Sequence, residues 1–176
     1  LKMQKNITKF LTISILLFVL IVFFISLNKV TRYDTKKLVG NKISDISLEL
    51  FEDEELLTDK DLKKNDFTLI NFWASWCSPC RQEHPFLLRL SKEKNLKILG
   101  VNFKDNQENA LKFLNDLGNP YDYVTKDISG KNSIYFGIYG IPESILVNEE
   151  LIIEQKFVGP ISEKDYKIIK NILRKK

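Results

Sequence analysis

The chain has 176 residues, which suits one ordinary domain with a short appendage. It is 44% hydrophobic and 28% charged, and these fractions exclude a disordered chain and a collagen-like fibre. Two cysteines exclude a disulfide-rich scaffold, and a single histidine, His84, excludes most histidine-based metal sites. The sequence has no GxGxxG or Walker-type loop, so it does not favour a nucleotide-dependent enzyme.

The net charge of +4 is concentrated near the N-terminus. Residues 1–37 contain seven basic side chains and one acidic side chain, and the rest of the chain contains 20 basic and 22 acidic side chains. The positive charge therefore flanks a hydrophobic segment. It does not predict a basic face that binds nucleic acid.

Residues 10–27, FLTISILLFVLIVFFISL, form an apolar run of 18 residues without a charge. As a helix the run would be about 27 Å long, close to the hydrocarbon core of about 30 Å. A cleaved signal peptide is the alternative, but it has a shorter apolar core and a small-x-small cleavage site, which NKVTRY does not supply. We therefore predict a short N-terminal tail at residues 1–9, a transmembrane anchor at 10–27 and a tether at 28–38. Basic residues flank both ends of the anchor, so its orientation is left open.

The predicted domain covers residues 39–176 and begins with alternating strand and helix patterns. Residues 68–73 and 96–103 are short, mostly apolar runs, typical of strands buried on both faces. A helix is predicted between them, from residue 79 to about residue 93.

A second helix is predicted to follow Asp105, which would act as its N-cap, with Glu108 in a capping-box position. Gly118 ends this helix. The strand–helix–strand–helix order predicts a parallel βαβ unit. The apolar stripe of the second helix consists of Ala110, Leu111, Phe113, Leu114 and Leu117.

The C-terminal third predicts a hairpin and a last helix. Residues 144–148 and 151–158 are strand-like runs, and Glu149-Glu150 would form the turn between them. Ser162 and Asp165 form a capping-box pattern before an amphipathic run. The fold class is therefore α/β, with a central mixed sheet flanked by helices.

The motif WCSPC at residues 76–80 lies between a buried strand and a helix. Cys77 would lie at the helix N-terminus, where unpaired N–H groups and the helix dipole favour a thiolate. Cys80 follows three residues later, close enough to form a disulfide. The pair predicts thiol–disulfide exchange, in which Cys77 attacks a disulfide and the less exposed Cys80 resolves the mixed disulfide.

Other uses of a CxxC pair fit less well. A closed zinc site needs four ligands, and the chain has no second CxxC and only one histidine. Arg81 follows Cys80, so the motif is not a CxxCH haem attachment site. A purely structural disulfide would close a loop too short to add much stability.

The run FWASWCSPC at residues 72–80, with Pro85 five residues after the second cysteine, resembles the active site of a thioredoxin fold. More narrowly, the chain resembles the membrane-anchored thiol:disulfide interchange proteins of cytochrome c maturation (the CcmG/DsbE family) over residues 38–173 and the anchor. The matching runs are LVG (38–40), CRQEH (80–84), GVNFKD (100–105), LGNPY (117–121) and GIYGIPES (137–144).

This resemblance implies a thioredoxin-like fold and a groove around the cysteines. Pro142 would be a cis-proline that faces the CxxC motif, and Ile141 would offer its backbone N–H and C=O to a client peptide. Tyr139 would line the groove. Trp76, Ser78 and Pro79 would belong to the groove, with Trp76 exposed, whereas Trp73 and His84 are expected to pack inside the domain.

The chain departs from general thioredoxins at Asn71, where those proteins place a buried Asp that exchanges protons with the resolving thiol. Asn cannot titrate, so Glu83, one helical turn after Cys80, and Glu143, beside Pro142, are the available carboxylates. Both positions are acidic in the family that the chain resembles. Each is predicted to tune the groove, with a solvated surface position as the alternative.

The resemblance implies a thiol:disulfide oxidoreductase tethered to the bacterial inner membrane, with its domain on the periplasmic side. It would reduce a disulfide of apocytochrome c or of a maturation partner before haem attachment, and a membrane thiol electron donor would re-reduce it. No cofactor and no metal are expected, since the dithiol carries two electrons. The alternatives are an anchored reductant for another client, such as a copper-site assembly protein, and a non-catalytic peptide-binding module.

Overall fold

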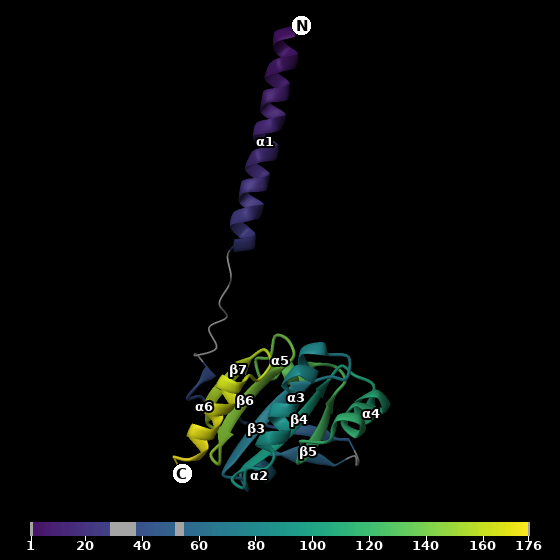
Figure 1. Cartoon of the computed structure of the whole chain (residues 1–176), viewed down its shortest axis with the longest axis vertical. Helices are drawn as coiled ribbons and strands as arrows, with labels where there is room; N and C mark the ends of the chain where they lie inside the picture. The colour runs from purple at the N-terminus through teal and green to yellow at the C-terminus, as the bar shows by residue number, and fades with distance from the viewer. Residues whose placement is uncertain (1, 29–37, 52–54, 176) are drawn as a thin grey trace. The chain divides into compact units, whose positions relative to one another are not determined.

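The computed structural model describes residues 2–28, 38–51 and 55–175. The chain divides into two units, residues 1–34 and residues 35–176, which we describe separately (Figure 1). The predicted tether at residues 28–38 falls almost entirely outside the described residues.

Helix α1 runs over Lys2–Asn28, so it includes the predicted anchor and extends through most of the predicted tail. Its most apolar stretch, Lys9–Ser26, has a mean hydropathy of 2.6, and none of it is buried. By length and composition, this helix could cross a membrane.

The second unit is built on a seven-stranded sheet with the order β2-β1-β5-β4-β3-β6-β7. The central strands β3, β4 and β5 are parallel, and the outer strands join them in antiparallel pairs. This arrangement confirms the predicted mixed sheet. The strands are β1 (Ser47–Leu50), β2 (Leu56–Thr58), β3 (Phe67–Trp73), β4 (Leu96–Phe103), β5 (Tyr123–Asp127), β6 (Glu143–Asn148) and β7 (Ile153–Val158).

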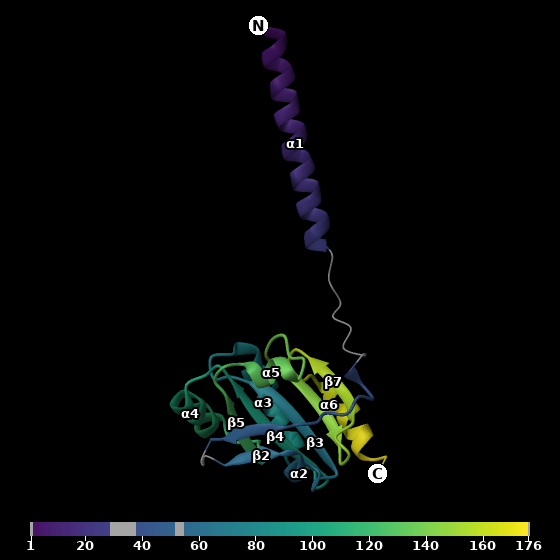
Figure 2. The same ribbon diagram turned by 180° about the vertical axis from the view of Figure 1, so that it is seen from behind.

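Helices cover both faces of the sheet. Helices α3 (Ser78–Leu90), α4 (Gln107–Leu117) and α6 (Glu163–Leu173) contribute to one apolar cluster (Figure 1). Helix α2 (Asp59–Leu62) and the segment after α5 (Lys131–Tyr135) contribute to a second cluster on the opposite face (Figure 2). The fully buried strand β3 separates the two clusters, as its mostly apolar run predicted.

Several predicted boundaries are wrong. Helix α3 ends at Leu90, about three residues before its predicted end. Two further errors have a local cause. The N-cap of α4 is Asn106, whose side chain accepts the N–H of Asn109. Asp105 instead accepts hydrogen bonds from Ser75, in the turn before Cys77. Strand β7 begins later than predicted because Leu151 has a positive φ of 64° and belongs to the turn. The predicted capping box of Ser162 and Asp165 is confirmed.

Position 100 in β4 requires glycine, because the rings of Tyr121 and Trp73 occupy the space that a side chain would need. A Cβ atom there would lie 2.8 Å from Tyr121 Cγ and 2.9 Å from Trp73 Nε1. The two rings stack with centroids 5.4 Å apart. This close approach brings the Tyr121 hydroxyl into the polar network of the site.

Candidate active site

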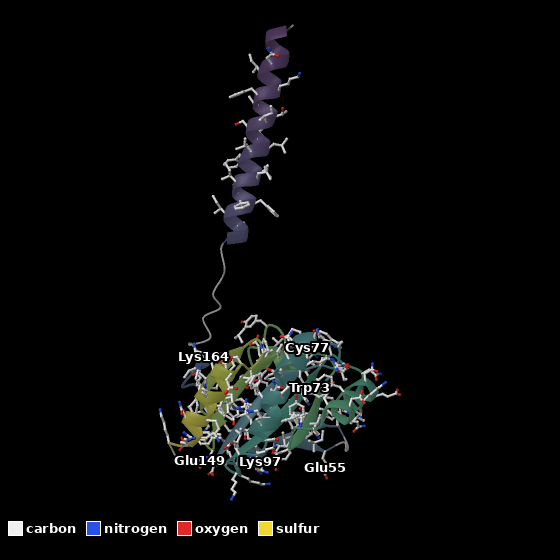
Figure 3. The ribbon with its side chains drawn as sticks, viewed as in Figure 1. Glu55, Trp73, Cys77, Lys97, Glu149 and Lys164 are labelled. Atoms are coloured by element: carbon white, nitrogen blue, oxygen red, sulfur yellow. A yellow bond between two sulfur atoms is a disulfide. The ribbon has the colours of Figure 1, made fainter. Side chains whose placement is uncertain are left out.

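The two cysteines form a disulfide at the start of α3. Cys77 is the N-cap residue, Pro79 lies in the first turn, and the Cys77 and Cys80 Cα atoms are 5.3 Å apart. The backbone N–H of Cys80 donates a hydrogen bond to Cys77 Sγ over 3.2 Å. Figure 3 places Cys77 at one end of the domain and Trp73 deeper inside it. A helix N-terminus and a backbone donor both favour negative charge on the Cys77 sulfur.

Burial does not distinguish the two cysteine residues in the oxidised form. Cys77 is 4% exposed and Cys80 is 2% exposed. Trp76 is 59% exposed, as the sequence predicted, and Ser78 and Pro79 are also exposed. Access to the pair is therefore bordered by Trp76 and the first turn of α3.

Charged side chains hold the turn that precedes Cys77. Asp105, at the start of the β4–α4 connection, accepts the Ser75 N–H over 2.5 Å and the Ser75 hydroxyl over 2.8 Å. Arg81 donates to the Ser75 carbonyl over 3.3 Å, and the Trp76 indole N–H donates to the Lys104 carbonyl over 3.2 Å. We call the contacts between Asp105 and Ser75 the Asp105–Ser75 clamp. No pattern in the sequence identifies it, because Asp105 precedes an amphipathic run and is therefore expected to cap a helix.

We expect Asp105→Ala to lower the free energy of unfolding by about 1–3 kcal/mol, because the Ser75 donors lose their acceptor. The same variant should slow peptide-disulfide reduction, because the turn that leads to Cys77 is released. Asp165→Ala is the matched control, since Asp165 accepts the N–H and hydroxyl of Ser162 on α6. Urea unfolding and a reduction assay on both variants measure the two effects; equal loss of activity in both would contradict a specific role for Asp105.

A buried polar network lies behind the cysteines on the same face of the sheet. Asn71 Nδ2 donates to Glu83 Oε1 over 2.8 Å and to Ser144 Oγ over 3.0 Å. The Tyr121 hydroxyl donates to Asn71 Oδ1 over 2.8 Å, and the Ile161 N–H donates to Glu83 Oε2 over 2.8 Å. Glu83 therefore does not lie on a solvated helix face. No pattern in the sequence indicated that Tyr121 and Ser144 would join this network.

The buried carboxyl of Glu83 has a strongly perturbed acidity. Burial raises its pKa from 4.5 to about 7, against the opposing effect of the hydrogen bonds from Ile161 and Asn71. Burial and the nearby Glu83 charge raise the pKa of Tyr121 well above its usual value of 10. At neutral pH, Glu83 is therefore the group of this network that can take up or release a proton.

The loop before β6 completes the site. The Ile141–Pro142 peptide bond is cis, as predicted. Ile141 is half-buried and packs against the cluster that contains both cysteines. Tyr139 is 72% exposed, whereas Glu143 is 3% exposed and turns its carboxylate inward.

Trp73 and His84 belong to the core, as expected. Trp73 is 1% exposed and lies between Phe113 and Tyr121. His84 Nε2 bonds to the Gly118 carbonyl over 2.8 Å, and burial lowers the pKa of its imidazole. Within residues 2–28, 38–51 and 55–175, no group of three or more His, Cys, Asp or Glu side chains could hold a metal ion.

Comparisons with known proteins agree with this geometry. The family model described as Redoxin matches residues 38–173. The thiol:disulfide interchange protein HelX of Rhodobacter capsulatus is 39% identical over 126 residues, which cover 72% of this chain and 71% of HelX. The thiol:disulfide interchange protein CycY of Rhizobium leguminosarum bv. viciae is 51% identical over 104 residues, which cover 59% of this chain and 55% of CycY.

A solved structure gives the same fold. The thioredoxin-family thiol:disulfide interchange protein from Chlorobium tepidum TLS superposes with a TM-score of 0.64 at 23% identity, covering 76% of this chain and 97% of that one. A cysteine pair in CxxC spacing within this fold is suited to dithiol–disulfide exchange. The chain therefore belongs to the redoxin family, within its DsbE/CcmG-type thiol:disulfide interchange proteins, and is a thiol:disulfide oxidoreductase.

Proposed function

We propose that this oxidoreductase is anchored in the bacterial inner membrane by α1 and acts as a reductant on the periplasmic side. Its client is apocytochrome c, or a maturation partner that forms a disulfide with apocytochrome c. The observation that carries the proposal is the Cys77–Cys80 pair at a helix N-terminus, in a chain whose separate helix can span a membrane. Its resemblance to the cytochrome c maturation family supplies the client class.

The reaction needs only the dithiol and a client disulfide. The Cys77 thiolate attacks one client sulfur, which forms a mixed disulfide and releases the other client sulfur as a thiolate. Cys80 then loses its proton and attacks the Cys77 sulfur, which closes the Cys77–Cys80 disulfide and releases the second client thiolate. Two electrons pass to the client, and a membrane thiol donor returns the protein to its reduced form.

Side chains of the site take separate roles in this scheme. Trp76, Ser78 and Pro79 border the attacking sulfur, and Tyr139, Ile141 and Pro142 form the wall against which the client backbone lies. Glu83 accepts the proton that Cys80 must lose, in place of the Asp that general thioredoxins carry at the position of Asn71. The perturbed acidity of Glu83 supports this role.

Topology is the first test of the proposal. A phosphatase that is active only in the periplasm, fused after Lys176, should be active in cells, and a reporter that is active only in the cytoplasm should be silent. Deletion of residues 10–27 should release the domain from the membrane fraction. The opposite reporter pattern would reject the periplasmic assignment.

Trapping identifies the client. The Cys80→Ala variant cannot resolve the mixed disulfide, so clients should remain bound to Cys77 and be released by a reducing agent. We expect apocytochrome c or a maturation partner among the trapped proteins, and the Cys77→Ala/Cys80→Ala variant as control should trap neither. Recovery of a copper-site assembly protein alone would favour the other client class.

A further inference from the structure

A lysine and a glutamate are buried together behind the loop that leads to Pro142. Glu143 begins β6 and Lys156 lies on β7, where pairing of Ile145 with Lys156 places both charged side chains on one face of the sheet. Lys156 Nζ and Glu143 Oε2 are 2.8 Å apart, and the two side chains are 0% and 4% exposed. The contact is an ion pair. Either charge would be costly to bury alone.

The ion pair also binds the backbone of the loop. Glu143 Oε1 accepts the N–H groups of Tyr139 and Gly140, each over 3.1 Å. Lys156 Nζ donates to the Gly137 carbonyl over 2.7 Å. Because the two charges are carried by neighbouring strands, they fix the backbone of residues 137–140 to the sheet.

This loop lies beside the cysteines. Ile141 packs against the cluster that contains Cys77 and Cys80, and also against the cluster on the other face. Phe72 of β3 pairs with Glu143 of β6, so the strand that leads into the cysteine turn runs next to the end of the loop. A polypeptide that reaches Cys77 therefore meets a backbone that the ion pair has already fixed.

We propose that Glu143 and Lys156 are positioning residues for polypeptide disulfides. They preform the edge to which a client segment adds as a short strand, so binding does not have to order the loop. The inference rests on the proposed use of this loop as the client groove. A small disulfide needs no such edge, so the ion pair should govern the rate with peptides and not the rate with small disulfides.

The decisive variant is Lys156→Met, tested with two substrates. With a synthetic peptide that carries a disulfide in a CxxCH sequence, kcat/KM should fall by about tenfold or more, mainly through KM. With a small aromatic disulfide, the reduced variant should react close to the wild-type rate. Amide hydrogen exchange at Tyr139 and Gly140 should become faster, because their acceptor is no longer held by the lysine.

Two further variants separate positioning from folding. Lys156→Met leaves the buried Glu143 charge unpaired and can therefore unfold the domain. Glu143→Gln/Lys156→Met removes both charges and keeps an amide oxygen for the Tyr139 N–H. This double variant should therefore be more stable than Lys156→Met, but it should still reduce the peptide disulfide slowly. Lys126→Met is a control away from the loop, since it breaks a partly exposed ion pair between Lys126 on β5 and Glu49, 2.6 Å long. Strand β5 is separated from β7 by three strands.

The outcomes are distinct. Selective loss of peptide reduction in a variant that circular dichroism shows to be folded supports the proposal. Equal loss with both substrates, or no loss with either, means that the ion pair is only structural and overturns it. A wild-type protein that reduced neither substrate would overturn the proposed function, and this inference with it.

Discussion

Alkylation of the reduced protein at pH 7 should modify Cys77 at least about tenfold faster than Cys80. The expectation depends on thiolate stability and not on exposure, because both cysteine residues are almost fully buried in the oxidised form. The Cys77 sulfur lies at the N-terminus of α3 and accepts the Cys80 N–H. Cys80 lies among apolar side chains, where burial disfavours a thiolate.

The same asymmetry sets the effect of each cysteine variant on activity. Cys77→Ser should lower peptide reduction to background, because the attacking sulfur is lost. Cys80→Ala should still form one mixed disulfide per molecule and then stop, because nothing resolves it. Mass spectrometry after a timed pulse of alkylating agent measures the alkylation rates of Cys77 and Cys80. A reduced Lys126→Met variant serves as a control that keeps both thiols and the Asp105–Ser75 contacts. Equal rates, or faster modification of Cys80, would reverse the assigned roles.

Local patterns were sufficient for the central part of the fold. The apolar runs of β3 and β4, the capping box of α6 and the apolar stripe of α4 each lie within one contiguous segment, so periodicity reveals them. Strand β5 was not predicted, because Tyr123–Asp127 is a short, half-buried segment with mixed polar residues. Strands β1 and β2 are shorter still and were also missed.

The residues of the site also fall into two groups: those that a local motif marks and those that only the fold brings together. The cysteine pair and the cis-proline could be predicted because motifs mark them. The Asp105–Ser75 clamp, the Asn71–Tyr121 contact and the Glu143–Lys156 pair join residues that the fold brings together from distant parts of the chain. No spacing in the sequence encodes such contacts. For the same reason, sequence alone left the burial of Glu83 open.

A second large effect should appear when the buried carboxylate is removed. Glu83→Gln should slow release of the client from the mixed disulfide while leaving the first attack by Cys77 nearly unchanged, because Cys80 loses its proton acceptor. In the wild type, the release rate should rise with pH around a midpoint of about 7, where Glu83 ionises. This rise should be absent in Glu83→Gln. Stopped-flow tryptophan fluorescence with a peptide disulfide can separate the two steps.

The free energy of unfolding should also depend on the ionisation of Glu83, which gives a measurement that is independent of catalysis. The pKa of Glu83 is raised in the folded protein, so its contribution to stability is complete below pH 4.5 and is lost as pH rises through about 7. From the pKa rise, the loss is about 3 kcal/mol. Chemical unfolding should therefore show a fall in the free energy of unfolding over this range that Glu83→Gln lacks. Glu163→Gln, at an exposed ion pair with Arg89, should retain the fall.

The most specific test exchanges the acid and the amide between positions 71 and 83. In the double variant Asn71→Asp/Glu83→Gln, the new amide at position 83 can donate to the new carboxylate at position 71 and accept the Ile161 N–H. The Tyr121 hydroxyl can donate to the same carboxylate, so the network keeps its hydrogen bonds and holds an acid at the place where general thioredoxins have one. We expect the double variant to recover release of the mixed disulfide and its pH dependence relative to Glu83→Gln. If Glu83→Gln changes neither step nor the pH profile, or if the exchange restores stability without restoring release, Glu83 is a structural acid and does not carry the proton.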